Sequence, residues 1–295
     1  MTAIIAGGAD CDLHPAVPHL TSLLPYMNDY WRDQVTTRGM VDLVSQSYPA
    51  NSPISSRPDW RPAQGKPGSN LDDMRTQALD PFKVGYGILN PLYGVQMVFS
   101  EDMQDAFCRA LNDWLAKEWL EKDKRLRASI VIPTQSVEKS VAEIERCAAD
   151  HRFVQVLMLV MGDVPLGKRA LWPIYATAER LGLPVGIHAG SAYHNPPTSS
   201  GWTSYHIEDY VANSQAFQTQ LTSLIVEGVF ARYPYGDAVG RPRADGNCTE
   251  QHPLFAATGG CPAGSGDSQP AVRPYAVGGI DPILDRLSAL AIRGR

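Results

Sequence analysis

The sequence predicts an α/β fold in which helices cover a parallel sheet. Between residues 84 and 230, short apolar runs alternate with stretches whose apolar residues recur every three or four positions, the spacing of an amphipathic helix. The short runs are apolar throughout, as expected for strands buried on both faces of a parallel sheet. A closed barrel and an open doubly wound sheet both fit this pattern. Because no GxGxxG, GxxxxGKS or GxxxxGKT motif follows any of the runs, the commonest nucleotide-binding reasons for an open sheet are absent.

The expected elements follow one another along the chain. Strands are expected at residues 3–6, 84–89, 126–132, 153–160 and 184–188. Ser100 and Ser136 are suited to cap the helices after the second and third strands, because a serine hydroxyl accepts a hydrogen bond from a free first-turn amide. Gly182 is suited to end the next helix, since glycine readily adopts the left-handed conformation required there. A long helix is expected over residues 210–230.

Two stretches depart from this alternation. Residues 47–81 are largely rich in proline and serine, have no periodicity, and are expected to form a long arm over the surface. Residues 235–295 hold 10 of the 25 glycines and 6 prolines but no lysine, methionine or tryptophan, so they do not read as a continuation of the preceding domain. We therefore expect one α/β domain over residues 1–234 and an irregular, poorly ordered tail, in which only residues 280–292 have a helical pattern.

Composition excludes several classes of function. The chain has 295 residues, 26 basic against 31 acidic side chains, and a net charge of -5, which argues against a nucleic-acid partner or an anionic membrane surface. No run reaches the roughly 18 apolar residues of a membrane span. The N-terminus lacks the basic and apolar regions of a signal peptide, so a cytoplasmic location is expected. The five cysteines are scattered and odd in number, which argues against a disulfide framework or a structural zinc knuckle.

The residues best suited to carry chemistry are Asp12, His14 and His188. Asp10, Asp12 and His14 alternate after the first expected strand, so in an extended chain they point to one side, where a carboxylate and an imidazole can meet one cation. His188 closes the apolar strand at 184–188, at the edge where parallel α/β folds keep their active sites. The alternatives are a polar turn at Asp10–His14 and a core histidine at position 188.

Weaker candidates lie on the segments that follow other strands. Asn90 follows the second expected strand, and His194 and Trp202 lie in the loop after the strand that contains His188. These three residues are candidate substrate-binding side chains at the same mouth, with an ordinary solvated loop as the alternative. No GxSxG elbow occurs, so acyl-enzyme chemistry has no support.

Four short motifs, taken in order, resemble a known family. DCDLHP, IVIP, LPVGIHAG and EGVFARYP are similar to the amidohydrolase-related family, in its aminocarboxymuconate-semialdehyde decarboxylase-like branch, over about residues 5–234. The resemblance implies a (β/α)8 barrel with one divalent metal, usually zinc, at its C-terminal face. The family's first strand carries D-x-H-x-H, whose histidines bind the metal and here correspond to Asp12 and His14. The family's fifth-strand histidine ligand corresponds to His188.

The chain departs from the family after EGVFARYP. There the family continues into a sixth strand with a catalytic histidine and, after an eighth strand, a catalytic aspartate. Residues 235–295 contain no assignable counterpart, so the catalytic residues stay unknown and the TIM-type (β/α) barrel is expected to be incomplete, with about five of eight βα units.

The resemblance also implies an activity. It is that of a metal-dependent hydrolase or carboxy-lyase acting on a small carboxylated organic substrate through a metal-bound water. Self-association into a homo-oligomer is left open. One alternative is an inactive, truncated or frameshifted barrel without the catalytic second half. A weaker alternative is a metal-free α/β domain that binds a sugar or an acid.

Overall fold

The computed structural model describes residues 7–44, 56–192, 194–233 and 255–258. A parallel sheet of six strands, in the order β1-β2-β3-β4-β5-β6, forms its centre. The strands are β1 (Ala9–Leu13), β2 (Tyr86–Leu89), β3 (Leu126–Val131), β4 (Phe153–Met161), β5 (Val185–Ser191) and β6 (Phe255–Thr258). The spatial order follows the sequence order without the reversal that marks a doubly wound sheet. The expected incomplete TIM-type barrel is therefore confirmed.

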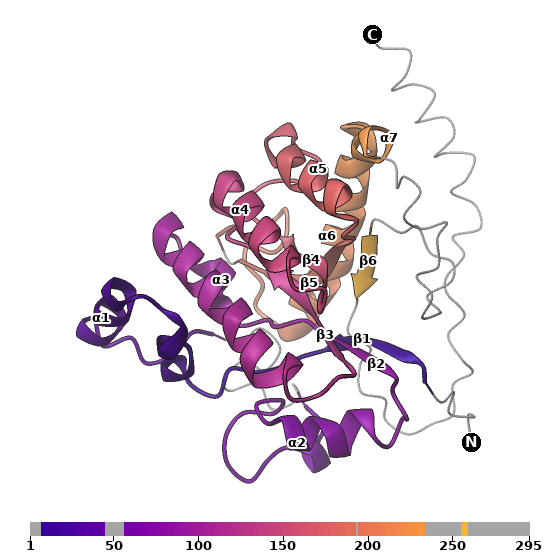
Figure 1. Cartoon of the computed structure of the whole chain (residues 1–295). Helices are drawn as coiled ribbons and strands as arrows, with labels where there is room; N and C mark the ends of the chain where they lie inside the picture. Colours follow the sequence, from indigo (N-terminus) through magenta and orange to yellow (C-terminus); the bar gives the residue numbers. More distant parts are fainter. Residues whose placement is uncertain (1–6, 45–55, 193, 234–254, 259–295) are drawn as a thin grey trace.

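Helices cover one side of this sheet, as Figure 1 shows for α3, α4, α5 and α6. The helices are α1 (Asp29–Thr37), α2 (Leu71–Met74), α3 (Glu101–Leu115), α4 (Val137–Ala148), α5 (Trp172–Leu181), α6 (His206–Val226) and α7 (Val229–Arg232). Shorter helical segments are η1 (Leu20–Tyr26), η2 (Pro58–Trp60), η3 (Arg75–Leu79), η4 (Gly94–Met97), η5 (Ala116–Leu120) and η6 (Arg169–Leu171). None of the described helices combines the length and the apolar character needed to cross a membrane.

The signals expected at the helix ends are confirmed. The Ser100 side chain accepts a hydrogen bond from the Met103 amide, and the Ser136 side chain accepts one from Lys139. Gly182 follows α5 with a φ of 66°, the left-handed conformation expected at this position. The capped helices thus begin where the sequence indicates and leave the segments before them at the C-terminal edge of the sheet.

The core lies between the sheet and these helices. Phe107 and Leu111 of α3 are buried, as are Ile130 of β3, Val156 of β4 and Ile174 of α5. At about 25 cal/mol per Å² of apolar surface removed from water, this layer is the main source of stability in the described part of the chain.

The first strand differs from the expectation. The strand expected at residues 3–6 lies outside the described residues, and β1 instead spans Ala9–Leu13, so Asp10 and Asp12 belong to the strand itself. Its pairing with β2 joins Ala9 to Tyr86 and Asp10 to Gly87. The apolar pattern misses this strand because the strand carries site residues in place of a continuous apolar run.

The arm expected over residues 47–81 is partly helical, which corrects that prediction. α2 and η3 occupy residues 71–79, and the Asn70 side chain caps α2 by accepting a hydrogen bond from the Asp72 amide. Met74 and Leu79 are buried against the core. Five of the nine residues in α2 and η3 are polar, which leaves too few apolar positions for a periodic signal, so the cap at Asn70 is the cue that the pattern overlooks.

The bounds of one strand and one helix also differ from those expected from the sequence. β5 continues past His188 to Ser191, so His188 lies within the strand rather than at its end. The helix expected at 210–230 begins at His206 and is divided after Val226, because Gly228 adopts a φ of 79° that an α-helix does not contain.

The prediction of an irregular tail over residues 235–295 is also corrected in part. Phe255–Thr258 forms β6, which pairs in parallel with β5 through Val185 and Phe255 and through His188 and Thr258. A four-residue apolar run among glycines and prolines is too short to be assigned as a strand from sequence alone. The helical pattern at 280–292 lies outside the described residues.

Candidate metal centre

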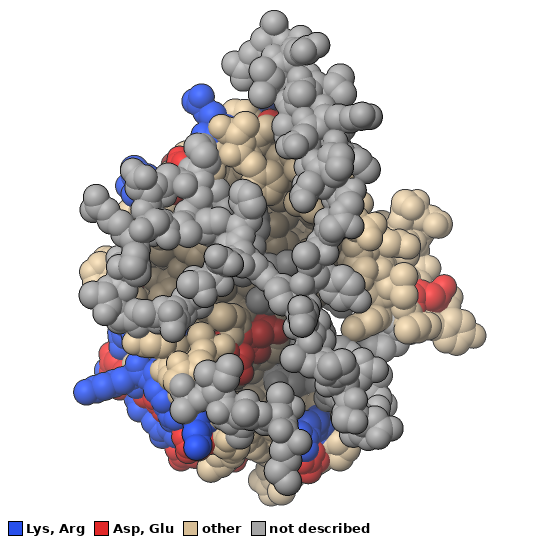
Figure 2. Space-filling model, turned by 90° about the vertical axis from the view of Figure 1, so that its right-hand side faces the viewer, with Lys and Arg blue, Asp and Glu red and all other residues tan. Residues whose placement is uncertain are grey.

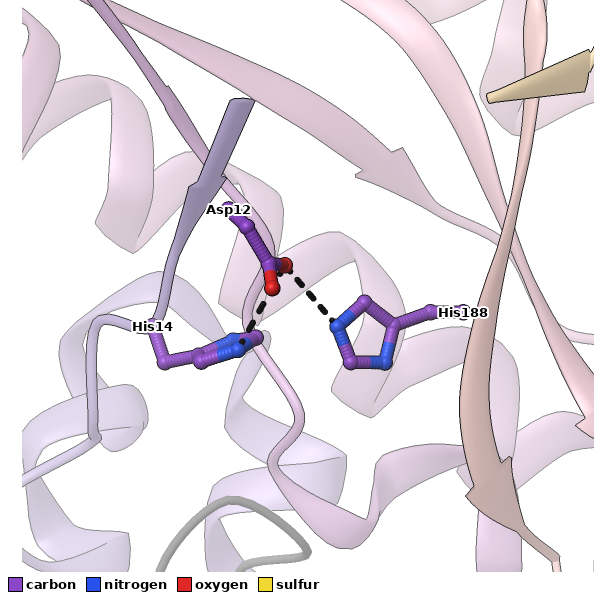
Figure 3. A group of neighbouring side chains, drawn as sticks. All are labelled: Asp12, His14 and His188. Carbon is purple, nitrogen blue, oxygen red and sulfur yellow. Dashed lines mark hydrogen bonds and ion pairs between the residues drawn. The ribbon is translucent and has the colours of Figure 1, made fainter. Parts of the chain in front are cut away.

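Three side chains that are distant in the sequence meet at the C-terminal end of the sheet (Figure 3). Asp12 lies in β1, His14 follows that strand, and His188 lies in β5. The Asp12 Oδ1 is 3.0 Å from the Nε2 of His188 and 3.5 Å from the Nε2 of His14. One ligand atom from each residue lies within 4.8 Å of the other two. The structure therefore brings the predicted metal ligands together.

Backbone carbonyls orient both imidazoles. The Nδ1 of His14 is 3.0 Å from the carbonyl oxygen of Asn90, and the Nδ1 of His188 is 2.6 Å from that of Ala189. A carbonyl oxygen only accepts hydrogen bonds, so each Nδ1 carries a proton and donates it. A neutral imidazole then presents the lone pair of Nε2, which is the form that binds a metal.

The donor set fits a divalent cation. The two Nε2 lone pairs and the Asp12 carboxylate are acceptors directed at one another, so a proton or a metal ion is needed between them. The pair of imidazoles is arranged edge to face, with ring centroids 5.0 Å apart. Two imidazole nitrogens and a carboxylate oxygen are ordinary ligands of zinc and of manganese.

The centre is buried on one side and accessible on the other. His188 is 3% exposed, whereas the side chains of His14 and Asp12 are 19% and 27% exposed. Figure 2 shows acidic side chains in the middle of the face that lies on the right in Figure 1, with most of the visible lysine and arginine side chains toward its margin. Acidic side chains gathered in this way attract cations to that face.

The ionisation of the ligands follows from these contacts. Burial raises the pKa of Asp12, but hydrogen bonds with His14 and His188 outweigh burial and hold that pKa well below its usual value. Burial lowers the pKa of His14, and the hydrogen bond with Asp12 outweighs it, so the pKa of His14 is raised. Asp12 is consequently a carboxylate at neutral pH, the form that binds metal.

Asn90, a predicted substrate-binding residue, lies beside Asp12 and is fully buried. Its Nδ2 donates to the carbonyl of Cys11 at 2.9 Å and to Asp12 Oδ1 at 3.2 Å. The structure thus places Asn90 against the metal ligands with no exposed surface of its own. A direct contact with substrate stays a prediction that this position does not favour.

His194 and Trp202 are not members of the three-residue group. The His194 Nδ1 is 2.5 Å from Asp163 Oδ1, its Nε2 is 3.1 Å from the Met97 carbonyl, and its ring stacks on Phe99. Trp202 is 64% exposed in the segment before α6. His194 therefore joins loops to one another, and the substrate-binding role of both residues stays a prediction.

Sequence reasoning missed two residues near the centre. Ser129 of β3 and Gln155 of β4 are buried polar side chains inside strands that are otherwise apolar, and both contact Asn90. A polar residue within a buried strand was the available signal, since such a group needs an internal hydrogen-bond partner.

An incomplete parallel (β/α) barrel that brings Asp12 of β1, His14 just after it and His188 of β5 to one point is the arrangement of a candidate metal-binding barrel protein. The chain belongs to the amidohydrolase family, because the family model described as amidohydrolase matches residues 9–254. The match covers Asp12, His14 and His188 and extends beyond residue 234.

Two curated relatives are decarboxylases. A gamma-resorcylate decarboxylase from Polaromonas sp. is 23% identical over 56% of this chain and 53% of its own length. A 2-amino-3-carboxymuconate-6-semialdehyde decarboxylase from Dictyostelium discoideum is 27% identical over 59% of this chain and 45% of its own length. The chain thus spans about half the length of the curated relatives that it matches.

Solved structures share the fold. An amidohydrolase from Mycobacterium avium subsp. paratuberculosis is 20% identical, with a TM-score of 0.58 over 79% of this chain and 72% of that protein. A 5-carboxyvanillate decarboxylase from Novosphingobium aromaticivorans, solved with manganese, is 18% identical, with a TM-score of 0.53 over 78% of this chain and 63% of that protein. At these identities the likeness concerns the fold alone.

Proposed function

We propose that this chain is a divalent-metal-dependent carboxy-lyase or hydrolase that acts on a small carboxylated organic substrate. The meeting of Asp12, His14 and His188 at one point is the observation that carries the proposal. Decarboxylation is favoured over hydrolysis because both curated relatives are named decarboxylases. The cytoplasmic location expected from the sequence stays a prediction, as does a homo-oligomer.

Asp12, His14 and His188 would hold one divalent ion. A bound cation would supply Lewis acidity that polarises a carboxylate or carbonyl oxygen of the substrate. Zinc is the metal implied by the sequence resemblance, and manganese is present in the 5-carboxyvanillate decarboxylase structure. Both metals accept this ligand set, so metal loading is to be compared with each.

The protein residues prepare the site in three ways. The carbonyls of Asn90 and Ala189 fix each imidazole with its Nε2 toward Asp12. The lowered pKa of Asp12 keeps the carboxylate charged. The partly exposed side chains of Asp12 and His14 leave one side through which a small anionic substrate can reach the centre.

Metal analysis of the purified protein tests the proposal. After loading with zinc or manganese and dialysis, we expect about one ion per chain, and we expect His188→Ala to lose it. His151→Ala is the matched control, because His151 is exposed between α4 and β4. Wild-type protein that retains no metal from an equimolar solution would exclude the proposed enzyme and leave the inactive barrel as the alternative.

An activity assay then separates the reaction types. Release of carbon dioxide is measured with 2,6-dihydroxybenzoate and 5-carboxyvanillate, the substrates named for two structural relatives. We expect release with metal-loaded protein and none after chelation. Metal-dependent hydrolysis of an ester or amide without release of carbon dioxide would favour the hydrolase instead.

A further inference from the structure

A buried row of polar side chains runs beneath the metal centre. Asn90 follows β2, Ser129 lies in β3 and Gln155 in β4, and all three are buried. The row therefore crosses three neighbouring strands and ends at Asp12 in β1. No buried side-chain nitrogen or oxygen among the described residues lacks a hydrogen-bond partner, and a fully bonded row of this kind holds its members in fixed orientations.

In each hydrogen bond of the row, the donor and the acceptor can be assigned. The Gln155 Nε2 donates to Ser129 Oγ at 2.7 Å and to Asn90 Oδ1 at 3.2 Å. Because Ser129 Oγ accepts from Gln155, its own proton is available for Asn90 Oδ1, which lies 2.6 Å away. Two donors thus converge on the Asn90 oxygen, and the flipped amide is excluded because its oxygen would then face the carbonyl of Cys11, which only accepts hydrogen bonds.

This direction decides what Asn90 presents to the metal centre. With its oxygen turned toward Ser129 and Gln155, its NH2 group must face the carbonyl of Cys11 and Oδ1 of Asp12. Its own carbonyl oxygen also accepts from the Nδ1 of His14. Asn90 consequently contacts two of the three ligand residues, one through its side chain and one through its backbone.

A glycine in β5, Gly186, leaves space for the side chain of Gln155. A Cβ atom at Gly186 would lie 3.1 Å from Gln155 Nε2 and 3.2 Å from its Cδ, which is closer than ordinary van der Waals contact. Glycine at this position therefore lets the Gln155 side chain occupy the space between the strands.

We propose that Asn90 is a positioning residue for the metal centre, and that Ser129 and Gln155 fix its amide so that it holds the Asp12 carboxylate. This inference rests on the proposed function, since it concerns the ligands of the same centre. Asn90 does not touch substrate in this role. It lowers the reorganisation that Asp12 and His14 undergo when a metal binds, and residues that support metal ligands in this way commonly change metal affinity by about 10–100-fold.

The test compares two buried asparagines. Asn90→Leu keeps the approximate side-chain shape and removes all of its side-chain hydrogen bonds, which join it to Cys11, Asp12, Ser129 and Gln155. Asn112→Leu is the matched control, because Asn112 is equally buried but bonds Val131 and Glu143 between α3, β3 and α4. The zinc and manganese Kd of each variant is measured by competition with a chelator, and Tm is measured with and without metal.

We expect Asn90→Leu to weaken the metal Kd by about tenfold or more and to reduce the metal-induced rise in Tm. Asn112→Leu should lower the metal-free Tm while leaving the Kd within about twofold of wild type, as expected of a purely structural amide. A variant that only loses stability would therefore show a lower Tm without a weaker metal Kd.

Ser129→Ala provides a smaller change that keeps the fold even where Asn90→Leu does not. It removes one of the two donors that fix the Asn90 oxygen, and we expect the Kd to weaken by a few-fold. A wild-type Kd in Ser129→Ala, together with a wild-type Kd in any folded Asn90→Leu, would overturn the positioning role while the proposed function stands. Absence of metal binding by the wild type would instead overturn the proposed function first.

Discussion

The Nε2 of His188 lies 3.0 Å from the Oδ1 of Asp12, although 176 residues separate them in the chain. β1 and β5 are separated by three intervening strands in the sheet. At about 4.8 Å between neighbouring strands, a flat sheet would place them about 19 Å apart. The direct contact between the two side chains therefore requires the sheet to curve as a barrel wall does, and this curvature brings the residues of the candidate metal centre together.

Replacing Asp12 by asparagine should weaken metal binding by at least about tenfold, because the charged ligand becomes a neutral amide while the shape is kept. Isothermal titration with zinc and with manganese measures the change. Asp163→Asn is the control, since Asp163 bonds His194 and Gln135 outside the three-residue group. Equal affinities for the two variants would contradict the assignment of Asp12 as a ligand.

Removing the metal should lower the free energy of unfolding. A ligand that binds only the folded state stabilises it by about 2.7 kcal/mol when its free concentration is a hundred times Kd. Urea unfolding of the metal-loaded protein with and without a chelator measures the difference. His188→Ala should unfold at the same urea concentration under both conditions, and a persistent effect of the chelator in this variant would show that the metal acts elsewhere.

Gly167→Ala should destabilise the contact between the segment before η6 and α6. A Cβ atom at Gly167 would lie 2.2 Å from the backbone oxygen of Ser223, so the two segments must separate. Overpacking of this kind commonly costs about 1–3 kcal/mol of unfolding free energy, which urea unfolding measures. Gly162→Ala is the control, because its nearest neighbour, the Leu159 carbonyl oxygen, lies 4.0 Å away. Similar losses in both variants would argue against this close approach.

We expect the free energy of unfolding to decrease in acid, partly because the Asp123 carboxylate becomes protonated. Hydrogen bonds from Arg125 and Arg75 outweigh burial and hold the pKa of Asp123 well below its usual 3.8. Between the two pKa values the unfolded chain binds the proton and the folded protein does not. The contribution is therefore fully present above pH 3.8 and is lost as the pH falls through the lower folded value.

Urea unfolding between pH 5 and pH 3 measures this dependence, over a range chosen around the ordinary aspartate pKa of 3.8. Asp123→Asn should be less stable than wild type at pH 5 and should lose less stability on acidification. Asp29→Asn is the control, since the Asp29 side chain is 98% exposed. An unchanged acid dependence in Asp123→Asn would show that this ion pair does not couple to folding.

Much of the scaffold could be predicted because its causes are local. Ser100, Ser136 and Gly182 act within one turn of the chain, and the apolar runs at β3 and β4 are long enough to indicate strands. Among the elements that escaped prediction, β1, α2 with η3, and β6 are short or carry polar residues. Their conformation comes from pairing and packing with distant segments such as β2 and β5.

The sequence by itself determined that helices cover a parallel sheet and indicated Asp12, His14 and His188 as candidate ligands, because strand composition, caps and the DxH spacing are properties of neighbouring positions. Only the tertiary structure decided that Asn90 faces Asp12 and that Ser129 and Gln155 fix its amide. It likewise decided that His194 bonds Asp163 rather than joining the ligands. Those relationships depend on strand register and sheet curvature, which set the distances between residues that no sequence spacing relates.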